Sequence, residues 1–195
     1  MDVTQTIWTK FHIKRHDTLP FFPWLEGASR QHLAELFFEL GFTKGAEIGV
    51  RLGSYSKILL DTNPNLSLLS IDPWSPYARV SQEKQDKFFS HCQRLLRGYK
   101  STLIRKTSMD ALNDVPDGSL DFVYIDGLHD FDSVMMDIIC WSRKVRFGGI
   151  VSGHDYYVNY REGVIMAVNA YTYANNIHQW YITKEKEASY FWVKS

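Results

Sequence analysis

The chain has 195 residues, of which 45% are hydrophobic and 15% are aromatic, with 22 basic and 22 acidic side chains. This length and apolar content fit one domain, residues 1–195, and leave little room for a second. The zero net charge argues against a nucleic-acid-binding protein, which needs a basic patch, and no apolar run approaches the roughly 18 residues of a membrane span.

Residues 1–27 are rich in aromatic side chains, and two prolines interrupt any regular element there. We expect this segment to be irregular, either a lid or a wrapped tail, with the core formed by residues 28–195. It lacks the apolar stretch of a signal peptide. Cys92 and Cys140 lie in helix-like segments far apart in the sequence. A disulfide framework is not expected, and a cytoplasmic location fits better.

From Ser29 an apolar stripe at helical spacing predicts a helix, with Gly41 as its C-cap. Strand-like and helix-like segments then alternate. Strands are predicted at 45–50, 66–72, 101–107, 119–127 and 148–155, and helices at 55–62, 81–97, 109–113, 131–145 and 163–175. This alternation predicts a parallel sheet with helices on both faces.

The last part of the chain has a different pattern. Two strand-like segments, 178–184 and 188–194, are joined by the polar residues EKE, which predicts an antiparallel hairpin. The sequence therefore predicts an α/β fold of five βα units and a terminal hairpin. Its sheet would be Rossmann-like, doubly wound, mostly parallel and seven-stranded.

An acid and two glycines stand where the first predicted strand turns into a helix, in the segment AEIGVRLGSYS. Ligands of open α/β sheets bind outside the carboxyl ends of the strands, and at Gly49 or Gly53 a side chain would push a ligand away. Glu47, two residues before the first glycine, suits a cationic ligand group rather than a phosphate. Asp72 ends the second strand, where an acid commonly accepts ribose hydroxyls. S-adenosylmethionine carries both a ribose and a cation.

Four motifs, in order and at strand ends, carry a family resemblance: AEIGVRLGSYS, SIDPW, LDFVYIDGLHDFDSVMMDI and GGIVSGHDY. The chain resembles a class I S-adenosylmethionine-dependent methyltransferase of the small bacterial and phage-type branch (methyltransferase family 24-like). The match runs from about Lys44 to Tyr156 and also implies the closing hairpin. Residues 1–43 carry no part of it.

The resemblance implies a role for several residues in binding S-adenosylmethionine. Glu47, Gly49 and Gly53 would line the methionine end, and Ser54 beside them would also bind the cofactor. Asp72 would take the ribose hydroxyls and Trp74 would pack on the adenine. Ser108 would sit near the adenine edge, and Asp126 would lie at the methyl-transfer centre. For four of them there is an alternative without a ligand. Glu47 and Asp72 could be solvated acids at strand ends. Trp74, beside a proline, could be a packing residue, and Ser108 could be a helix N-cap.

A polar cluster is expected where two neighbouring strands end, at Asp126, His129, His154 and Asp155. In some relatives, including certain sugar O-methyltransferases, acids at these strand ends hold a divalent metal, and a histidine three residues after the first acid acts as base. Asp126, His129 and Asp155 match that arrangement, whereas relatives often have an acid in place of His154. Mg²⁺ prefers oxygen ligands, and Mn²⁺ would tolerate the imidazole better. A hydrogen-bonded crevice without metal is the alternative.

Together these features predict a methyltransferase acting on a small-molecule or sugar hydroxyl, with His129 and Asp126 as catalytic residues. Asp126, His154 and Asp155 would hold any Mg²⁺ or Mn²⁺. We expect a small-molecule acceptor and neither nucleic acid nor membrane as partner, while association into a homo-oligomer stays open. The alternatives are a non-catalytic S-adenosylmethionine-binding protein, an N-methyltransferase, or an NAD-dependent oxidoreductase, which the glycine spacing disfavours.

Overall fold

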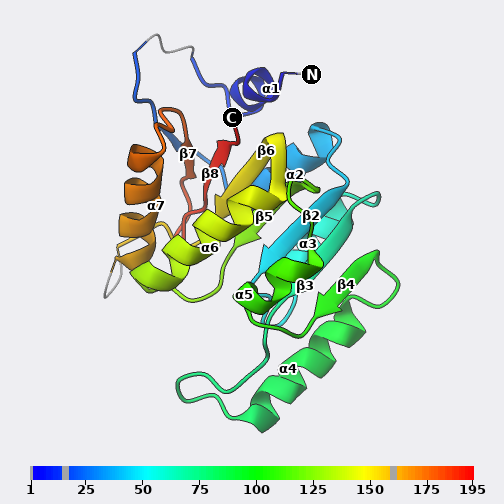
Figure 1. The fold of residues 1–195 in the computed structure, drawn as a ribbon. Helices are drawn as coiled ribbons and strands as arrows, with labels where there is room; N and C mark the ends of the chain where they lie inside the picture. Colours follow the sequence, from blue (N-terminus) through cyan, green and yellow to red (C-terminus); the bar gives the residue numbers. More distant parts are fainter. Residues whose placement is uncertain (1, 15–17, 159–161) are drawn as a thin grey trace.

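The structure is a computed structural model that describes residues 2–14, 18–158 and 162–195. Within these ranges one sheet has the strand order β1-β7-β8-β6-β5-β2-β3-β4 (Figure 1). The strands are β1 Trp24–Leu25, β2 Lys44–Ile48, β3 Ser67–Ile71, β4 Ser101–Ile104, β5 Leu120–Ile125, β6 Val145–Gly153, β7 Tyr181–Thr183 and β8 Tyr190–Val193. The helices are α1 Val3–Lys10, α2 Arg30–Glu39, α3 Ser54–Thr62, α4 Gln82–Leu95, α5 Ser108–Ala111, α6 Phe131–Lys144 and α7 Gly163–Ala174, with a 3₁₀ turn at Leu112–Asp114.

The sheet divides the hydrophobic core into two clusters. On β5, Phe122 and Tyr124 pack with residues of α1 to α4, whereas Val123 and Ile125 pack with residues of α5 to α7. A strand that is apolar on both faces is typical of the centre of a parallel sheet covered by helices on each side. The predicted doubly wound α/β architecture is confirmed.

The five βα units and the closing hairpin lie where the sequence predicted them. Strands β2 to β6 are mutually parallel, while β8 runs antiparallel to both β6 and β7. The structure adds an eighth strand to the seven that were predicted. This is β1, whose Trp24 pairs in parallel with Ile182 of β7 at one edge of the sheet.

The N-terminal segment is more regular than expected. Helix α1 begins after Asp2, whose carboxylate accepts a hydrogen bond from the Thr4 amide at 2.9 Å. Trp8 of α1 donates its indole N–H to the Tyr181 hydroxyl at 3.0 Å, and Lys10 pairs with Glu39 of α2 at 2.7 Å. The expectation of an irregular segment is therefore wrong for α1 and β1. That the whole chain forms a single domain stays a prediction.

The parallel strands end together, because Ile48 of β2 stands opposite both Ile71 of β3 and Ile125 of β5, and Ile125 stands opposite Gly153 of β6. The polar residues that follow these strands are thereby gathered at one edge of the sheet. None of the helices in the described ranges is long and apolar enough to cross a membrane.

Candidate functional site

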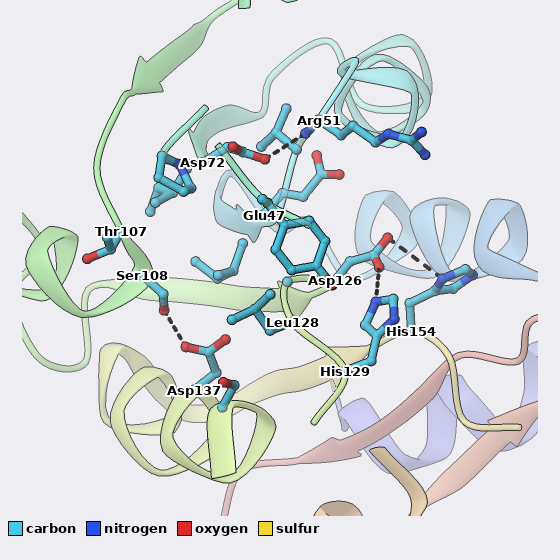
Figure 2. A pocket seen from close by; sticks show the side chains of 18 of the residues that line it. Glu47, Arg51, Asp72, Thr107, Ser108, Asp126, Leu128, His129, Asp137 and His154 are labelled. Carbon is cyan, nitrogen blue, oxygen red and sulfur yellow. Dashed lines mark hydrogen bonds and ion pairs between the residues drawn. The ribbon is translucent and has the colours of Figure 1, made fainter. Parts of the chain in front are cut away.

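A cavity of about 1180 Å³ opens at the carboxyl ends of β2 to β6. Its size lies just above the roughly 300–1,000 Å³ usual for small-molecule sites, which leaves room for a cofactor beside a second small molecule. Its polar residues come from the end of β2, from the loops after the strands and from neighbouring helices. Four acids are labelled among them in Figure 2: Glu47, Asp72, Asp126 and Asp137. Among the residues predicted for the site, those that line it are Glu47, Gly49, Ser54, Asp72, Ser108, Asp126, His129, His154 and Asp155.

Glu47 is a buried acid in the middle of the sheet. It is 2% exposed, and the Ser56 hydroxyl of α3 donates a hydrogen bond to its carboxylate. Burial raises the pKa of Glu47 to about 8, although the Ser56 hydrogen bond opposes this shift. A positively charged ligand group at this wall of the cavity would favour the ionised form.

Asp72, directly after β3, is held by backbone amides. One carboxylate oxygen accepts from the Arg51 N–H at 2.9 Å and the other from the Trp74 N–H at 2.7 Å. Each carboxylate oxygen can accept more than one hydrogen bond. The carboxylate is therefore fixed in direction and still able to accept hydroxyl groups from a ligand in the cavity.

Trp74 does not line the cavity, which corrects the predicted stacking on adenine. Its side chain is 0% exposed, packs on the Phe89 ring of α4 with centroids 4.8 Å apart, and donates its indole N–H to the Arg51 carbonyl at 2.8 Å. The backbone φ at Trp74 is 41°, and the ring lies in the core and not in the cavity wall. The packing alternative is the one the structure shows.

The two glycines in the turn between β2 and α3 leave room for different neighbouring groups. Gly49 has a φ of 90°, and a Cβ there would collide with the Asp126 carbonyl and lie 2.7 Å from the Gly127 Cα. Gly53 has a φ of 80°, and a Cβ there would lie 2.8 Å from the Cys92 sulfur of α4. Gly49 does line the cavity, but its missing side chain makes room for the end of β5. Gly53 lies outside the cavity lining and permits α3 to pack on α4, which corrects its predicted place beside the ligand.

The Ser108 hydroxyl makes two hydrogen bonds with protein groups. The N-cap of α5 is Thr107, whose side chain accepts from the Asp110 amide at 3.2 Å, so Ser108 is not the cap. Ser108 accepts the Trp141 indole N–H at 2.7 Å and donates to the Asp137 carboxylate. Ser108 lies in the cavity wall, as expected, but its hydroxyl proton is directed to Asp137.

The predicted polar cluster forms at the other end of the cavity (Figure 2). His129 Nε2 lies 2.9 Å from an Asp155 oxygen and 3.8 Å from Asp126, and His154 Nδ1 lies 3.4 Å from Asp155 and 3.7 Å from Asp126. One ligand atom from each of Asp126, His154 and Asp155 can lie within 4.8 Å of the others. The sequence therefore placed these four side chains together correctly.

The histidines of this cluster favour their charged forms in the metal-free arrangement. Hydrogen bonds with Asp126 and then Asp155 raise the pKa of His129 to about 10. Burial would lower the pKa of His154, but the hydrogen bond with Asp126 outweighs it and raises the value. Burial also acts to raise the pKa of Asp126, yet the two histidines hold it below its usual range.

The charged residues that line the cavity and were not predicted for the site include Arg30 at the start of α2 and Asp137 on α6, beside Arg51, Asp132 and Glu187. Arg30 lies outside the motifs, and no pattern in the sequence pointed to it. Asp137 had a signal: it stands on the apolar side of an amphipathic helix, three residues after Val134 and four before Trp141, both of which are buried. An acid on such a face is uncommon unless it has a polar partner.

Comparison with known proteins gives one family. A family model described as a methyltransferase domain matches residues 46–156. A curated relative, the uncharacterized protein y4gI of Sinorhizobium fredii, is 26% identical over 140 residues, which cover 70% of this chain and 14% of that protein. The chain therefore spans only a small part of that relative.

Solved structures share the fold. An O-methyltransferase from Bacillus cereus in complex with S-adenosylhomocysteine superposes with a TM-score of 0.64 at 12% identity, covering 100% of this chain and 90% of that one. The O-methyltransferase NovP gives a TM-score of 0.63 at 17% identity, covering 85% of this chain and 78% of NovP. At such identities the likeness is one of fold.

Proposed function

Because the chain belongs to the methyltransferase-domain family, in which it is a class I S-adenosylmethionine-dependent enzyme, we propose that it methylates a hydroxyl oxygen of a small molecule or sugar. The observation that carries this proposal is the cluster of His129, Asp126 and Asp155 in the cavity wall, with His129 Nε2 2.9 Å from Asp155. A hydroxyl is a weak nucleophile at neutral pH, and it needs a base or a metal ion.

The cavity residues fit S-adenosylmethionine. Glu47 presents a buried carboxyl to which a cationic group is the matching partner, and Asp72 holds its carboxylate ready to accept hydroxyls. When bound, the cofactor supplies an electrophilic methyl group on a sulfonium. The protein's part is to hold the acceptor oxygen in line with that methyl group, and such positioning can contribute roughly 7–11 kcal/mol to lowering the barrier.

His129 is our candidate for the base, and its neighbours decide whether it can act. Its side chain is 49% exposed in the cavity wall, so an acceptor hydroxyl can reach the ring. With both carboxylates free to pair with it, the raised pKa keeps His129 protonated at neutral pH. A cation held by Asp126 and Asp155 would compete for those carboxylates and leave the ring neutral. The proposals of a base and of a metal therefore support each other.

Asp126, His154 and Asp155 would hold the metal ion. Two carboxylates and one imidazole are a donor set that Mn²⁺ accepts more readily than Mg²⁺. The ion would supply a lower pKa for a bound hydroxyl. If no ion binds, the same residues form a hydrogen-bonded crevice in which His129 accepts a proton only at alkaline pH.

The test is transfer to a pooled library of hydroxyl compounds, with methylated products identified by mass spectrometry. We expect turnover with S-adenosylmethionine, its loss in EDTA, and its return with Mn²⁺ or Mg²⁺. Full turnover by metal-free protein in excess EDTA would decide for the crevice without metal. In parallel, calorimetry should show binding of S-adenosylhomocysteine and much weaker binding of NAD. Binding of NAD without S-adenosylhomocysteine would remove the proposal altogether.

A further inference from the structure

A guanidinium group in the cavity wall has no anionic partner among the residues that the structure describes. Arg30, the first residue of α2, is partly buried and lines the cavity. Its side chain forms neither an ion pair nor a hydrogen bond with a described residue. An arginine is always charged in proteins. This fixed positive charge is not used in the proposed catalytic steps, so its place in the wall needs another explanation.

Contacts of the backbone, and not of the charge, hold Arg30 in position. Its N–H donates to the Glu185 carboxylate in the turn of the closing hairpin at 2.7 Å, and its carbonyl accepts from the Tyr55 hydroxyl of α3 at 3.1 Å. The guanidinium carbon lies 5.5 Å from the centre of the Tyr55 ring, which also lines the cavity. An aromatic face holds a guanidinium by cation–π attraction and leaves its N–H groups able to donate to an anion.

Arg30 lies near the catalytic end of the cavity. The Tyr55 ring packs on the Tyr124 ring of β5 with centroids 4.2 Å apart, and the Tyr124 ring lies 6.1 Å from that of His154. Burial is the largest influence on the pKa of His154, and among the smaller influences the charge of Arg30 acts to lower it. The guanidinium is therefore within electrostatic range of the residues proposed to bind and activate the acceptor hydroxyl.

The carboxylate of the cofactor is the competing partner, because Arg30 is also within electrostatic range of Glu47, the acid matched to the cofactor's ammonium group. Another part of the wall suits that carboxylate. Helix α3 begins at Ser54, which lines the cavity, and no side chain caps its first backbone N–H groups. Such free N–H groups and the helix dipole favour an anion. The start of α3 can take the cofactor's carboxylate, which leaves Arg30 for an anion carried by the second molecule.

We propose that the methyl acceptor is an acidic hydroxyl compound, whose carboxylate pairs with Arg30 while its hydroxyl reaches the cluster of His129, Asp126 and Asp155. This inference rests on the proposed function and names the class of its acceptor. A guanidinium and a carboxylate can form two parallel hydrogen bonds. The pair would therefore fix the orientation of the acceptor as well as hold it, and in-line transfer requires that orientation.

Matched acids and amides test the role of the negative charge. Glucuronate, lactate and salicylate are compared with glucuronamide, lactamide and salicylamide, which have nearly the same size and no charge. The protein is saturated with S-adenosylhomocysteine, and EDTA prevents the acids from acting through a metal ion. A ligand that binds only the folded protein raises its unfolding temperature. We expect the acids to reach half of their maximal effect at concentrations lower by about tenfold or more.

Arg30→Gln removes the charge and keeps the backbone contacts with Glu185 and Tyr55. The variant should lose the preference for acids over amides and bind S-adenosylhomocysteine with wild-type affinity. Arg51→Gln is the matched control, because Arg51 also lines the cavity, but its guanidinium carbon lies 5.7 Å from the centre of the Phe88 ring of α4. This control should keep the preference for the acids.

Four results would overturn the inference. They are equal stabilisation of the wild type by acids and amides, no stabilisation by either set, a preference that survives in Arg30→Gln, and one that is lost in Arg51→Gln. If Arg30→Gln binds S-adenosylhomocysteine more weakly but its decarboxylated analogue normally, Arg30 instead holds the cofactor's carboxylate.

A second variant covers the case in which Arg30→Gln does not fold. Arg30→Lys keeps the charge but cannot form two parallel hydrogen bonds, so the preference for the acids should be smaller than in the wild type and still present. An unchanged preference in folded Arg30→Lys would contradict the paired geometry. A wild-type protein that does not bind S-adenosylhomocysteine would instead remove the proposed function on which the inference rests.

Discussion

The buried carboxyl of Glu47 should link binding of the cofactor product to pH. Below its pKa of about 8 the group is mostly neutral, so pairing with a ligand ammonium requires the loss of a proton. The affinity for S-adenosylhomocysteine should therefore rise with pH up to about 8, by as much as about tenfold per pH unit. Above pH 8 it should fall again as the ligand amine, with a reference pKa of about 8, loses its charge.

The same group has the opposite effect on the stability of the unliganded protein. The pKa of Glu47 is raised from 4.5 to about 8 on folding, so its contribution to the free energy of unfolding is largest below pH 4.5 and is lost as pH rises to about 8. Glu47→Gln should remove both the rise in affinity and the fall in stability. Between about pH 5 and pH 8, calorimetry would measure the affinity for S-adenosylhomocysteine, and thermal unfolding would measure the stability of the unliganded protein. An affinity that stays constant in the wild type would show that Glu47 does not meet the ligand cation.

Substituting each histidine of the cluster in turn should distinguish the catalytic role of His129 from the metal-binding role of His154. His129→Ala should reduce single-turnover transfer by about 10²-fold or more, because a positioned base is lost, while cofactor affinity stays nearly unchanged. His154→Ala should weaken metal binding, and saturating Mn²⁺ should restore transfer. The opposite pattern, with His129→Ala active and His154→Ala inactive at saturating metal, would mean that the wrong histidine has been named as base.

The pH profile of transfer gives an independent check on His129. In metal-free protein its pKa of about 10 keeps it protonated, so any residual transfer should increase steadily into the alkaline range. With metal bound, the rise should occur at lower pH, because the cation competes for Asp126 and Asp155. Identical profiles with and without metal would contradict the link between the ion and the base.

The turn between β2 and α3 should be sensitive at Gly49 for structural reasons. Gly49→Ala puts a Cβ into the Asp126 carbonyl and also requires an alanine at a φ of 90°. We expect a loss of roughly 2–4 kcal/mol in the free energy of unfolding, from left-handed strain and overpacking together. Gly118→Ala is the control, since Gly118 has a φ of 65° with open space around it, and it should cost only about 1 kcal/mol.

Urea denaturation of both variants would measure the difference between their free energies of unfolding. The cofactor affinity of folded Gly49→Ala would show whether its cofactor site is still intact. If both variants lose the same stability, the Asp126 carbonyl does not confine Gly49. If Gly49→Ala is as stable as the wild type and only binds the cofactor more weakly, the original sequence argument, that a side chain there meets the ligand, would be restored.

The sequence predicted the positions of most helices and strands, but it did not predict the directions of several side chains. The helix that begins after Ser29 and the strand around Val123 carry strong periodic patterns, and so their positions were predicted within a few residues. Helix α1 was missed because its sequence, VTQTIWTK, is rich in β-branched residues, which favour helices weakly. Its contacts with the hairpin and α2 are tertiary, and a single sequence does not reveal them.

Within the site, the types of residue at the strand ends predicted which side chains would line the cavity better than they predicted where those side chains would point. The acids at the strand ends, such as Asp126, could be placed because parallel strands end at one edge. The Trp74 ring is held by contacts with Phe89 and the Arg51 carbonyl, and the role of Gly53 depends on a sulfur in another helix. Neither is encoded in the neighbouring sequence. Asp137 was visible as an acid on an apolar face, but its partner Ser108 is 29 residues away.

The N-terminal helix should act as a clamp on the fold and not as a lid on the cavity. None of the described residues up to 27 lines the cavity, and Ile7 is 0% exposed in the core shared with α2 and β8. Ile7→Ala should lower the free energy of unfolding by about 2–5 kcal/mol and leave the affinity for S-adenosylhomocysteine unchanged. A tenfold weaker affinity with unchanged stability would favour a lid.

The contact between Trp8 and Tyr181 spans 173 residues of sequence, and this has a consequence for biosynthesis. A ribosome adds roughly 5–20 residues per second, so α1 waits on the order of 10 s for its partner strands to appear. During that time the nascent chain exposes Ile7, Trp8 and Phe11, side chains that the finished protein packs in or against its core. Docking of α1 against the closing hairpin therefore has to wait until that hairpin has been made, and until then these residues form an apolar segment that chaperones can recognise.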